Sequence, residues 1–203
     1  MKITAIKQQV KRQDRYSIYV DEKYLFSFSE NELINSGLKK GQELTEQELL
    51  GLKDQAVLDK AYDRSLNLIS HRPRSEWELR DYLKRKDYDE DVIAQTLEKL
   101  HERGYVNDLD FAQRWVATRR LLKPTSKRRL SQELRQKRIS DDVITQVLEA
   151  DETDERDVLK ELVEKKRRQT KYQDDLKLMQ YLARQGFDYG QIKDALNEQD
   201  GGE

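Results

Sequence analysis

From about Thr45 onward, apolar residues recur every three to four positions in short runs separated by polar turns. This spacing predicts amphipathic helices, each with one buried face. The runs come in groups of three, and three groups follow one another along the chain. We expect Val57 to lie on the buried face of the first helix of the first group. In the first helix of the second group we expect the same of Trp115, Thr118 and Leu122.

The groups are copies of one another. Residues 75–100 align with residues 126–151 without a gap, so that Leu79 matches Leu130 and Leu83 matches Leu134. A weaker third copy places Leu178, Leu182, Phe187, Ile192 and Leu196 at the equivalent positions. Self-similarity at a fixed period indicates a tandem repeat, in which each small module leans on its neighbours.

The first 44 residues follow a different pattern. Residues 3–9 alternate in polarity, and residues 16–20 and 24–28 are rich in β-branched and aromatic side chains. These segments predict three short antiparallel strands, with a tight turn at 21–23. A short helix over 30–36 should follow and end at Gly37. Strands this short need a partner surface, so we expect them to lean on the first long helix.

Helix boundaries are also readable from the sequence. Thr45 with Glu48, and Ser75 with Glu78, have the form of capping boxes. Gly104 and Gly186 stand where helix ends favour a left-handed residue. Further N-cap candidates are Asn107, Ser126, Ser140 and Asp188.

These patterns predict a mainly α chain of three tandem three-helix repeats in an elongated arrangement, preceded by a small N-terminal antiparallel β element. We place the β extension and short helix at 1–44 and the repeats at 45–106, 107–152 and 153–200. The chain is 35% hydrophobic and 39% charged. That balance suits several thin cores better than one large core, and the periodic apolar positions argue against disorder.

Candidate chemistry is sparse. The chain has no cysteine and no recognisable phosphate-binding or nucleophile motif. Its two histidines, His71 and His101, are not in metal-ligand spacing, and the acidic residues at 89–91 are typical of a helix start. No apolar run or leader indicates a membrane span or signal peptide. We therefore expect a cytoplasmic binding protein that is not an enzyme, with no cofactor, metal or membrane association.

Charge segregation is the feature that points to a partner. The net charge is only −1, yet cations crowd the second copy, where Glu133 alone opposes them between residues 114 and 138. Such a face fits an acidic surface or a phosphate backbone, although a merely solvated face is the alternative. We expect Trp77 and Trp115 to be core or seam residues, and Tyr105 and Phe111 to pack between modules. The candidate basic face comprises Arg119, Arg120, Lys123, Lys127, Arg128, Arg129, Arg135, Lys137 and Arg138, with Arg80, Lys84 and Arg85 in the first copy.

Several motifs together resemble the RecX family, regulators of the RecA recombinase. They are GYVNDLDFA at 104–112, RRLSQELRQK at 128–137 and YLARQGFD at 181–188, with an N-terminal part from Arg15 to Gly41 that is similar to the β extension of some members. Two positions depart from the family pattern. A Gly-Pro pair expected before Arg128 is replaced by the sequence TSK, and a glycine expected after Lys137 is replaced by Arg138.

The resemblance implies three three-helix repeats that bind in the groove of the RecA–single-stranded-DNA filament and bridge its subunits. It implies inhibition of the recombinase, ATPase and coprotease activities of RecA in DNA repair, homologous recombination and the SOS response. Single-stranded DNA is a further candidate partner, and we expect a monomer. Two alternatives stay open: a stand-alone DNA-binding regulator that uses its basic helical modules, and a passive helical scaffold.

Overall fold

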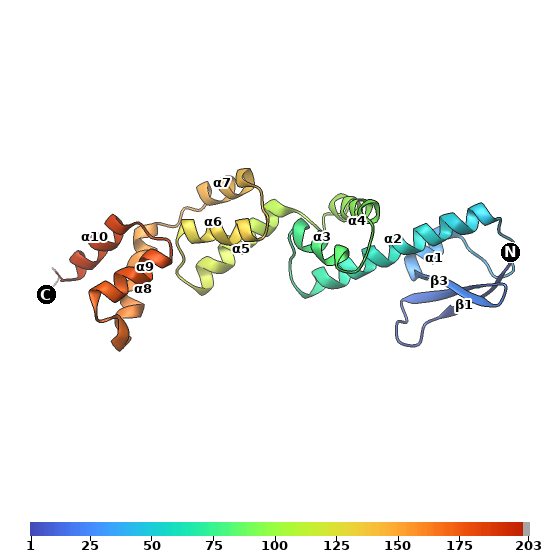
Figure 1. The fold of residues 1–203 in the computed structure, drawn as a ribbon, viewed down its shortest axis with the longest axis horizontal. Helices are drawn as coiled ribbons and strands as arrows, with labels where there is room; N and C mark the ends of the chain where they lie inside the picture. Colours follow the sequence, from blue (N-terminus) through green and yellow to red (C-terminus); the bar gives the residue numbers. More distant parts are fainter. Residues whose placement is uncertain (201–203) are drawn as a thin grey trace. The chain divides into compact units, whose positions relative to one another are not determined.

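The computed structural model describes residues 1–200 and forms two compact units, Met1–Val106 and the part from Asn107 onward (Figure 1). The described residues form ten α-helices, one three-stranded sheet and a 3-10 turn. The predicted architecture, mainly α with three three-helix repeats after an N-terminal antiparallel β element, is confirmed. Within the described part, no helix combines the length and apolar character that crossing a membrane requires.

The N-terminal sheet has the order β1-β2-β3, with β1 at Ile3–Gln8, β2 at Arg15–Val20 and β3 at Lys23–Ser29. Asp21 and Glu22 connect β2 to β3 with φ of 45° and 66°. Two consecutive positive φ angles match the twist of a tight antiparallel hairpin. Helix α1, Glu30–Ser36, follows and ends at Gly37, whose φ is 62°. The predicted strands, turn and short helix are confirmed.

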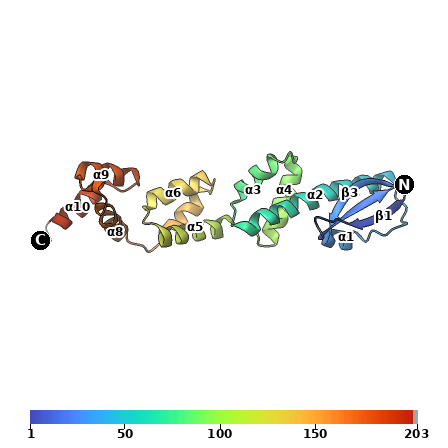
Figure 2. The ribbon, with the colours of Figure 1, turned by 90° about the horizontal axis from the view of Figure 1, so that it is seen from below.

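The sheet packs against the N-terminal half of α2, Glu46–His71 (Figures 1 and 2). Their shared core includes Phe28 on the sheet and Leu49 on the helix. Beside it, the buried Arg15 guanidinium lies 2.9 Å from Asp59 and 2.9 Å from Asp63, both on α2. A buried charge requires such partners, because desolvation without them is expensive. The expected support of the sheet by the first long helix is therefore confirmed.

The C-terminal half of α2 forms the first three-helix module with α3, Glu76–Lys84, and α4, Glu90–Glu102. Leu79, Leu83 and Ile93 are fully buried in its core. Both predicted capping boxes, at Thr45 and Ser75, are present.

The expected burial of Val57 is wrong, since this side chain is 42% exposed. Helix α2 buries one face against the sheet, through Leu49 and Ala56, and another face in the first module, through Ala61 and Ser65. At 100° per residue, Val57 lies between these two faces.

The second unit contains two modules. The first of them consists of α5, Asp108–Leu122, α6, Lys127–Gln136, and α7, Asp141–Glu149. The other consists of α8, Glu155–Arg167, a 3-10 turn at Thr170–Tyr172, α9, Asp175–Arg184, and α10, Tyr189–Asp200. Each predicted N-cap side chain, at Asn107, Ser126, Ser140 and Asp188, accepts a hydrogen bond from a backbone N–H of its helix. The third-copy positions Leu178, Leu182, Phe187, Ile192 and Leu196 are all buried.

The end of α5 departs from the expected pattern. Leu122 is 70% exposed and Thr118 is also exposed, so their expected burial is wrong. The buried side chains of α5 are Phe111, Ala112 and Val116, in the earlier part of the helix. Helix α5 continues past the core that it helps to form. The helical spacing of apolar residues therefore extends to Leu122, whereas the buried residues of α5 end at Val116.

Candidate partner and nucleic-acid interface

Helix α6 positions the centre of the basic face. Leu130 and Leu134 are fully buried on one side of this helix, while Arg128 and Arg135 are exposed on the other. Ser126 caps the helix by accepting a hydrogen bond from the Arg129 N–H at 3.0 Å. The first turn contains no acidic residue, although negative charge is the favourable sign at a helix N-terminus. The cations in the first turn of α6, Lys127, Arg128 and Arg129, therefore do not stabilise this N-terminus.

Five side chains meet at one flank of this face, and we call them the Trp115 cluster: Trp115 and Arg119 on α5, Arg129 and Glu133 on α6, and Lys137 just after α6. The Trp115 indole Nε1 donates to Glu133 Oε2 at 3.0 Å, and Arg119 Nε lies 2.8 Å from the same oxygen. Arg129 Nε lies 3.6 Å from Glu133 Oε1. The Arg119 guanidinium and the Lys137 ammonium lie 4.9 Å and 5.3 Å from the centre of the Trp115 ring. Three cations are thus arranged around one indole and one carboxylate.

Two of the candidate residues serve the packing of the second unit instead. Arg120 Nη2 lies 2.6 Å from Asp151 Oδ2, with side-chain exposures of only 12% and 7%, and Arg120 also donates to the Thr125 carbonyl. Lys127 donates its backbone N–H to Glu155 Oε1 at 2.6 Å and its Nζ to the Asp151 carbonyl at 2.8 Å. These contacts hold α6 against the segment that leads into α8.

Burial alone would raise the pKa of Asp151. Hydrogen bonds from Arg120 and from Thr153, whose Oγ1 donates to Asp151 Oδ1 at 2.6 Å, outweigh that effect and hold the pKa below its ordinary value. Asp151 therefore stays ionised and fixes the Arg120 side chain in the seam.

The remaining candidates differ in how far they are neutralised. Arg135 pairs with Asp141 at 2.8 Å, and Arg138 follows α6 in a left-handed conformation with a φ of 58°. Lys123 and Arg128 are exposed, and neither forms an ion pair with any residue that the structure describes. Carboxylates other than Glu133 therefore oppose the cations, because Asp141 pairs with Arg135 and Asp151 pairs with Arg120 from outside the basic stretch.

The first-copy candidates lie on α3 and just after it. Arg80 pairs with Glu90 and lies 3.7 Å from Glu76, and Arg85 lies 2.8 Å from Asp81. Lys84 is exposed and has no ion pair within residues 1–200. Two of the three first-copy cations are consequently paired with neighbouring carboxylates.

Of the aromatic residues that were expected to be packed, Trp115 agrees with the prediction, whereas Trp77 and Tyr105 do not. Trp115 is half-buried and stacks on Phe111 at 5.8 Å, which confirms a core-edge position. Trp77 is 39% exposed and Tyr105 is 52% exposed, so the expected packing of these two side chains is wrong. Trp115 and Glu133 were not predicted from the sequence to belong to the basic face. A signal for it exists, since Trp115 and Arg119 are four residues apart, as are Arg129, Glu133 and Lys137.

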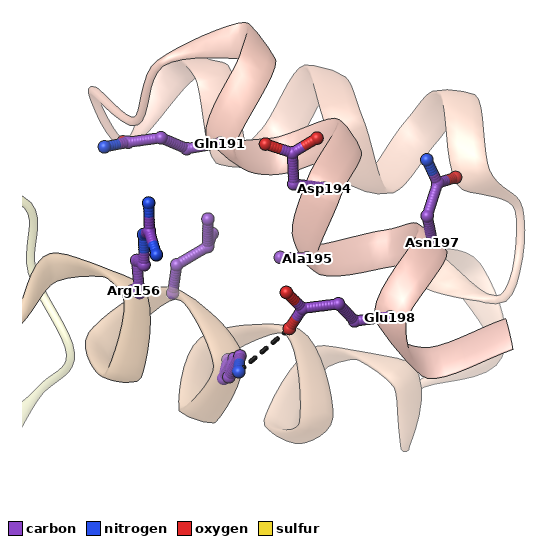
Figure 3. Close-up of a pocket in the computed structure, with 8 residues that line it drawn as sticks. Arg156, Gln191, Asp194, Ala195, Asn197 and Glu198 are labelled. Carbon is purple, nitrogen blue, oxygen red and sulfur yellow. Dashed lines mark ion pairs between the residues drawn. The ribbon is translucent and has the colours of Figure 1, made fainter. Parts of the chain in front are cut away.

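A second feature of this unit is an open polar groove of about 330 Å³ between α8 and α10 (Figure 3). Arg156 faces Asp194 and Gln191 across it, and the Lys160–Glu198 ion pair at 2.8 Å bridges the two helices. In the part of the chain that the structure describes, no three His, Asp or Glu side chains are grouped as a metal site.

The fold and the basic face define a class: a tandem three-helix-repeat protein with an N-terminal β extension and a cationic second module. Family models match all four parts. The Regulatory protein RecX N-terminal domain matches residues 1–45, and the first, second and third RecX three-helix domains match residues 61–100, 107–148 and 153–196. The chain belongs to the RecX family of regulatory proteins.

Similar proteins extend this assignment. A regulatory protein RecX of Bacillus velezensis is 34% identical over 201 residues, which cover 97% of this chain and 76% of the relative. One of Listeria monocytogenes is 41% identical over 151 residues, or 73% of this chain, and the match spans only 55% of that relative's length. A crystal structure of a regulatory protein RecX aligns with a TM-score of 0.72 and 31% identity, over 95% of this chain and 98% of the other.

Proposed function

We propose that this chain binds the RecA–single-stranded-DNA filament and inhibits the recombinase, ATPase and coprotease activities of RecA during DNA repair and recombination. Membership of a regulatory family supports this role. The observation that carries it is the second-module face, where Lys123 and Arg128 present charge that no described residue neutralises. A polyanionic filament is a suitable partner for such a face, because each unpaired cation can neutralise a phosphate of the DNA and release its counterion.

Two exposed leucines adjoin this face and suit the protein part of the filament. Leu121 is 85% exposed and Leu122 is 70% exposed, directly before Lys123. Adjacent apolar side chains on a surface of this kind favour contact with another protein. The proposed contact surface is therefore the end of α5 together with the outer side of α6.

The test is inhibition of the DNA-dependent ATPase of RecA by the full chain and by matched charge-reversal variants. Lys123→Glu with Arg128→Glu should raise the half-inhibitory concentration at least roughly tenfold, since two favourable contacts become repulsive. The control is Lys53→Glu with Lys60→Glu, an equal charge change at exposed positions of α2. We expect the control to inhibit as the unaltered chain does.

Two results would contradict the proposal. One is an unaltered chain that leaves RecA ATPase and strand exchange unchanged at stoichiometric amounts. The other is equal loss of inhibition in both double variants, which would mean that only net charge matters. Tight, sequence-dependent binding to duplex DNA without RecA would favour the stand-alone regulator instead.

A further inference from the structure

Glu133 holds an unusual position within the Trp115 cluster. Its carboxylate is 15% exposed and faces three donors: the Trp115 indole N–H, Arg119 and Arg129. Two guanidinium groups share this one carboxylate, and the Lys137 ammonium lies 5.3 Å from the centre of the same Trp115 ring. The cluster keeps a positive charge even with Glu133 in place.

The donors that hold Glu133 are those that bind phosphate. Guanidinium groups recognise carboxylate and phosphate oxygens with the same geometry. Arg119 and Arg129 are 36% and 43% exposed, so both remain accessible from solvent. Glu133 therefore occupies the place at which an external anionic oxygen would bind, and it keeps the donors arranged around that place.

The surroundings favour a nucleic-acid backbone over an acidic protein. Arg128, Gln132 and Gln136 continue the exposed side of α6, so the neighbourhood is polar and cationic. Interfaces with nucleic acids have that character, whereas the centres of protein interfaces are apolar and poor in charge.

We infer that the Trp115 cluster binds a phosphodiester group of single-stranded DNA and that Glu133 is its built-in competitor. DNA binds when a phosphate replaces the Glu133 carboxylate on Arg119 and Arg129, so Glu133 lowers the affinity of the second module for DNA. The choice of single-stranded DNA rests on the proposed function. The competition itself rests on the geometry of the cluster.

The test is the binding of the full chain to a fluorescein-labelled oligothymidylate, measured by anisotropy over a series of NaCl concentrations without RecA. Glu133→Gln should bind roughly three- to tenfold more tightly. Its log–log salt dependence should steepen by about 0.7 for each additional phosphate that is neutralised. The amide can still accept from the Trp115 indole. The control is Glu149→Gln, an equal charge change at an exposed position of α7, which should alter Kd less than about twofold.

Further variants localise the effect. Glu133→Gln combined with Arg119→Gln and Arg129→Gln should lose the gain, since the phosphate ligands are then absent. Arg129→Gln alone, at a half-exposed position, should weaken binding and flatten the salt dependence, which tests the site even if the Glu133 variant is unstable.

Three outcomes would overturn the inference: Glu133→Gln binding no more tightly than Glu149→Gln, a gain that survives the triple change, or a gain that is seen only when RecA is present. The last outcome would identify an acidic protein surface as the ligand. A failure of RecA inhibition would leave the anisotropy result standing, so the inference and the proposed function can fail separately.

Discussion

Arg138 shows how a single residue can be held in an unfavourable backbone conformation. Each module has a left-handed residue just after its second helix: Asp87 with a φ of 59°, Arg138 with 58° and Gly186 with 94°. Only glycine adopts this region without a steric penalty. Arg138 has a Cβ atom in this region, so the chain carries strain there.

Arg138→Gly should therefore raise the free energy of unfolding of the second unit by about 0.5 to 1 kcal/mol, after the greater flexibility of glycine in the unfolded chain is deducted. The measurement is the urea midpoint of that unit. Arg138→Ala is the matched control, because it removes the guanidinium but keeps the Cβ atom and its strain. Equal stabilities of the two variants would show that backbone strain is not the cause.

The Arg120–Asp151 pair makes a pH-dependent contribution. The pKa of Asp151 is lowered in the folded chain, so the pair stabilises the fold above the unfolded value of about 3.9. That stability is lost as the pH falls through the folded pKa. Asp151→Asn should destabilise the second unit by roughly 3 kcal/mol near neutral pH, since Arg120 loses its partner in a buried site.

The measurement that checks the Asp151 prediction is urea unfolding of the unaltered chain and of Asp151→Asn across the acidic pH range. The stability difference between them should shrink on acidification, because protonation removes the same charge from the unaltered chain. Glu149→Gln, on the surface of α7, should show neither effect. A difference that stays constant down to the lowest pH would mean that Asp151 acts through its shape alone.

At the scale of elements, the turn before α10 fits against the start of α6. Ser126 Oγ donates to the Gln185 carbonyl at 2.7 Å. A Cβ atom on Gly186 would lie 2.7 Å from Ser126 Oγ and 3.3 Å from the Arg129 backbone nitrogen. The second and third modules of the chain, which both belong to this unit, therefore approach each other closely at Gly186. The same contact supports the N-terminus of α6.

Gly186→Ala should destabilise the second unit by roughly 2 to 3 kcal/mol, the sum of a left-handed alanine and an overpacked contact. Gly41→Ala separates the two causes. Gly41 has a φ of 92°, close to the 94° of Gly186, and no atom lies within 4 Å of its added Cβ atom. We expect a loss of only about 1 to 2 kcal/mol there, in the first unit. Equal losses in urea unfolding would show that the Ser126 contact is unimportant.

Local elements were predictable from sequence, whereas the contacts between them were not. Capping boxes, strands and helix ends depend on residues three or four positions apart, as in Thr45 with Glu48, and these predictions are confirmed. The Arg15–Asp59 pair joins residues 44 positions apart, and the Ser126–Gln185 contact spans 59. Such contacts depend on tertiary packing, and the spacing of apolar residues along the chain does not predict them. Leu122 was misassigned for the same reason.

The candidate site was predictable to a similar degree. The cationic residues and their helix are readable from spacing, as Arg128 and Arg135 show. Their neutralisation is not, because Asp151 reaches Arg120 and Asp141 reaches Arg135 from beyond the basic stretch. The structure thus separates cations that serve packing from Lys123 and Arg128, which remain exposed.

At the scale of the whole molecule, each unit builds its hydrophobic cores from its own residues. The sheet core and the first-module core lie within Met1–Val106, and the other two cores lie within the part from Asn107 onward. Repeat proteins of this kind depend on contacts between neighbours. Where cores are separate, cooperative unfolding should be confined to the unit that contains each core.

The repeat supplies a matched pair of changes that tests this. Leu79 and Leu130 occupy equivalent positions in the first and second modules, and both are fully buried. Each change to alanine should remove about 2 to 5 kcal/mol from its own unit. One tryptophan lies in each unit, so a Trp77→Phe background reports the second unit through Trp115. In that background Leu130→Ala should lower the urea midpoint of the fluorescence transition, and Leu79→Ala should leave it unchanged.

The reciprocal background, Trp115→Phe, reports the first unit through Trp77, and there the effects of the two leucine changes should be exchanged. Equal shifts from both changes in either background would mean that the two units unfold as one cooperative body. Independent unfolding would have a consequence for function, because one unit could then bind a filament without a change in the fold of the other unit. The second-copy part of the basic face would then depend for its stability on the two modules of the second unit alone.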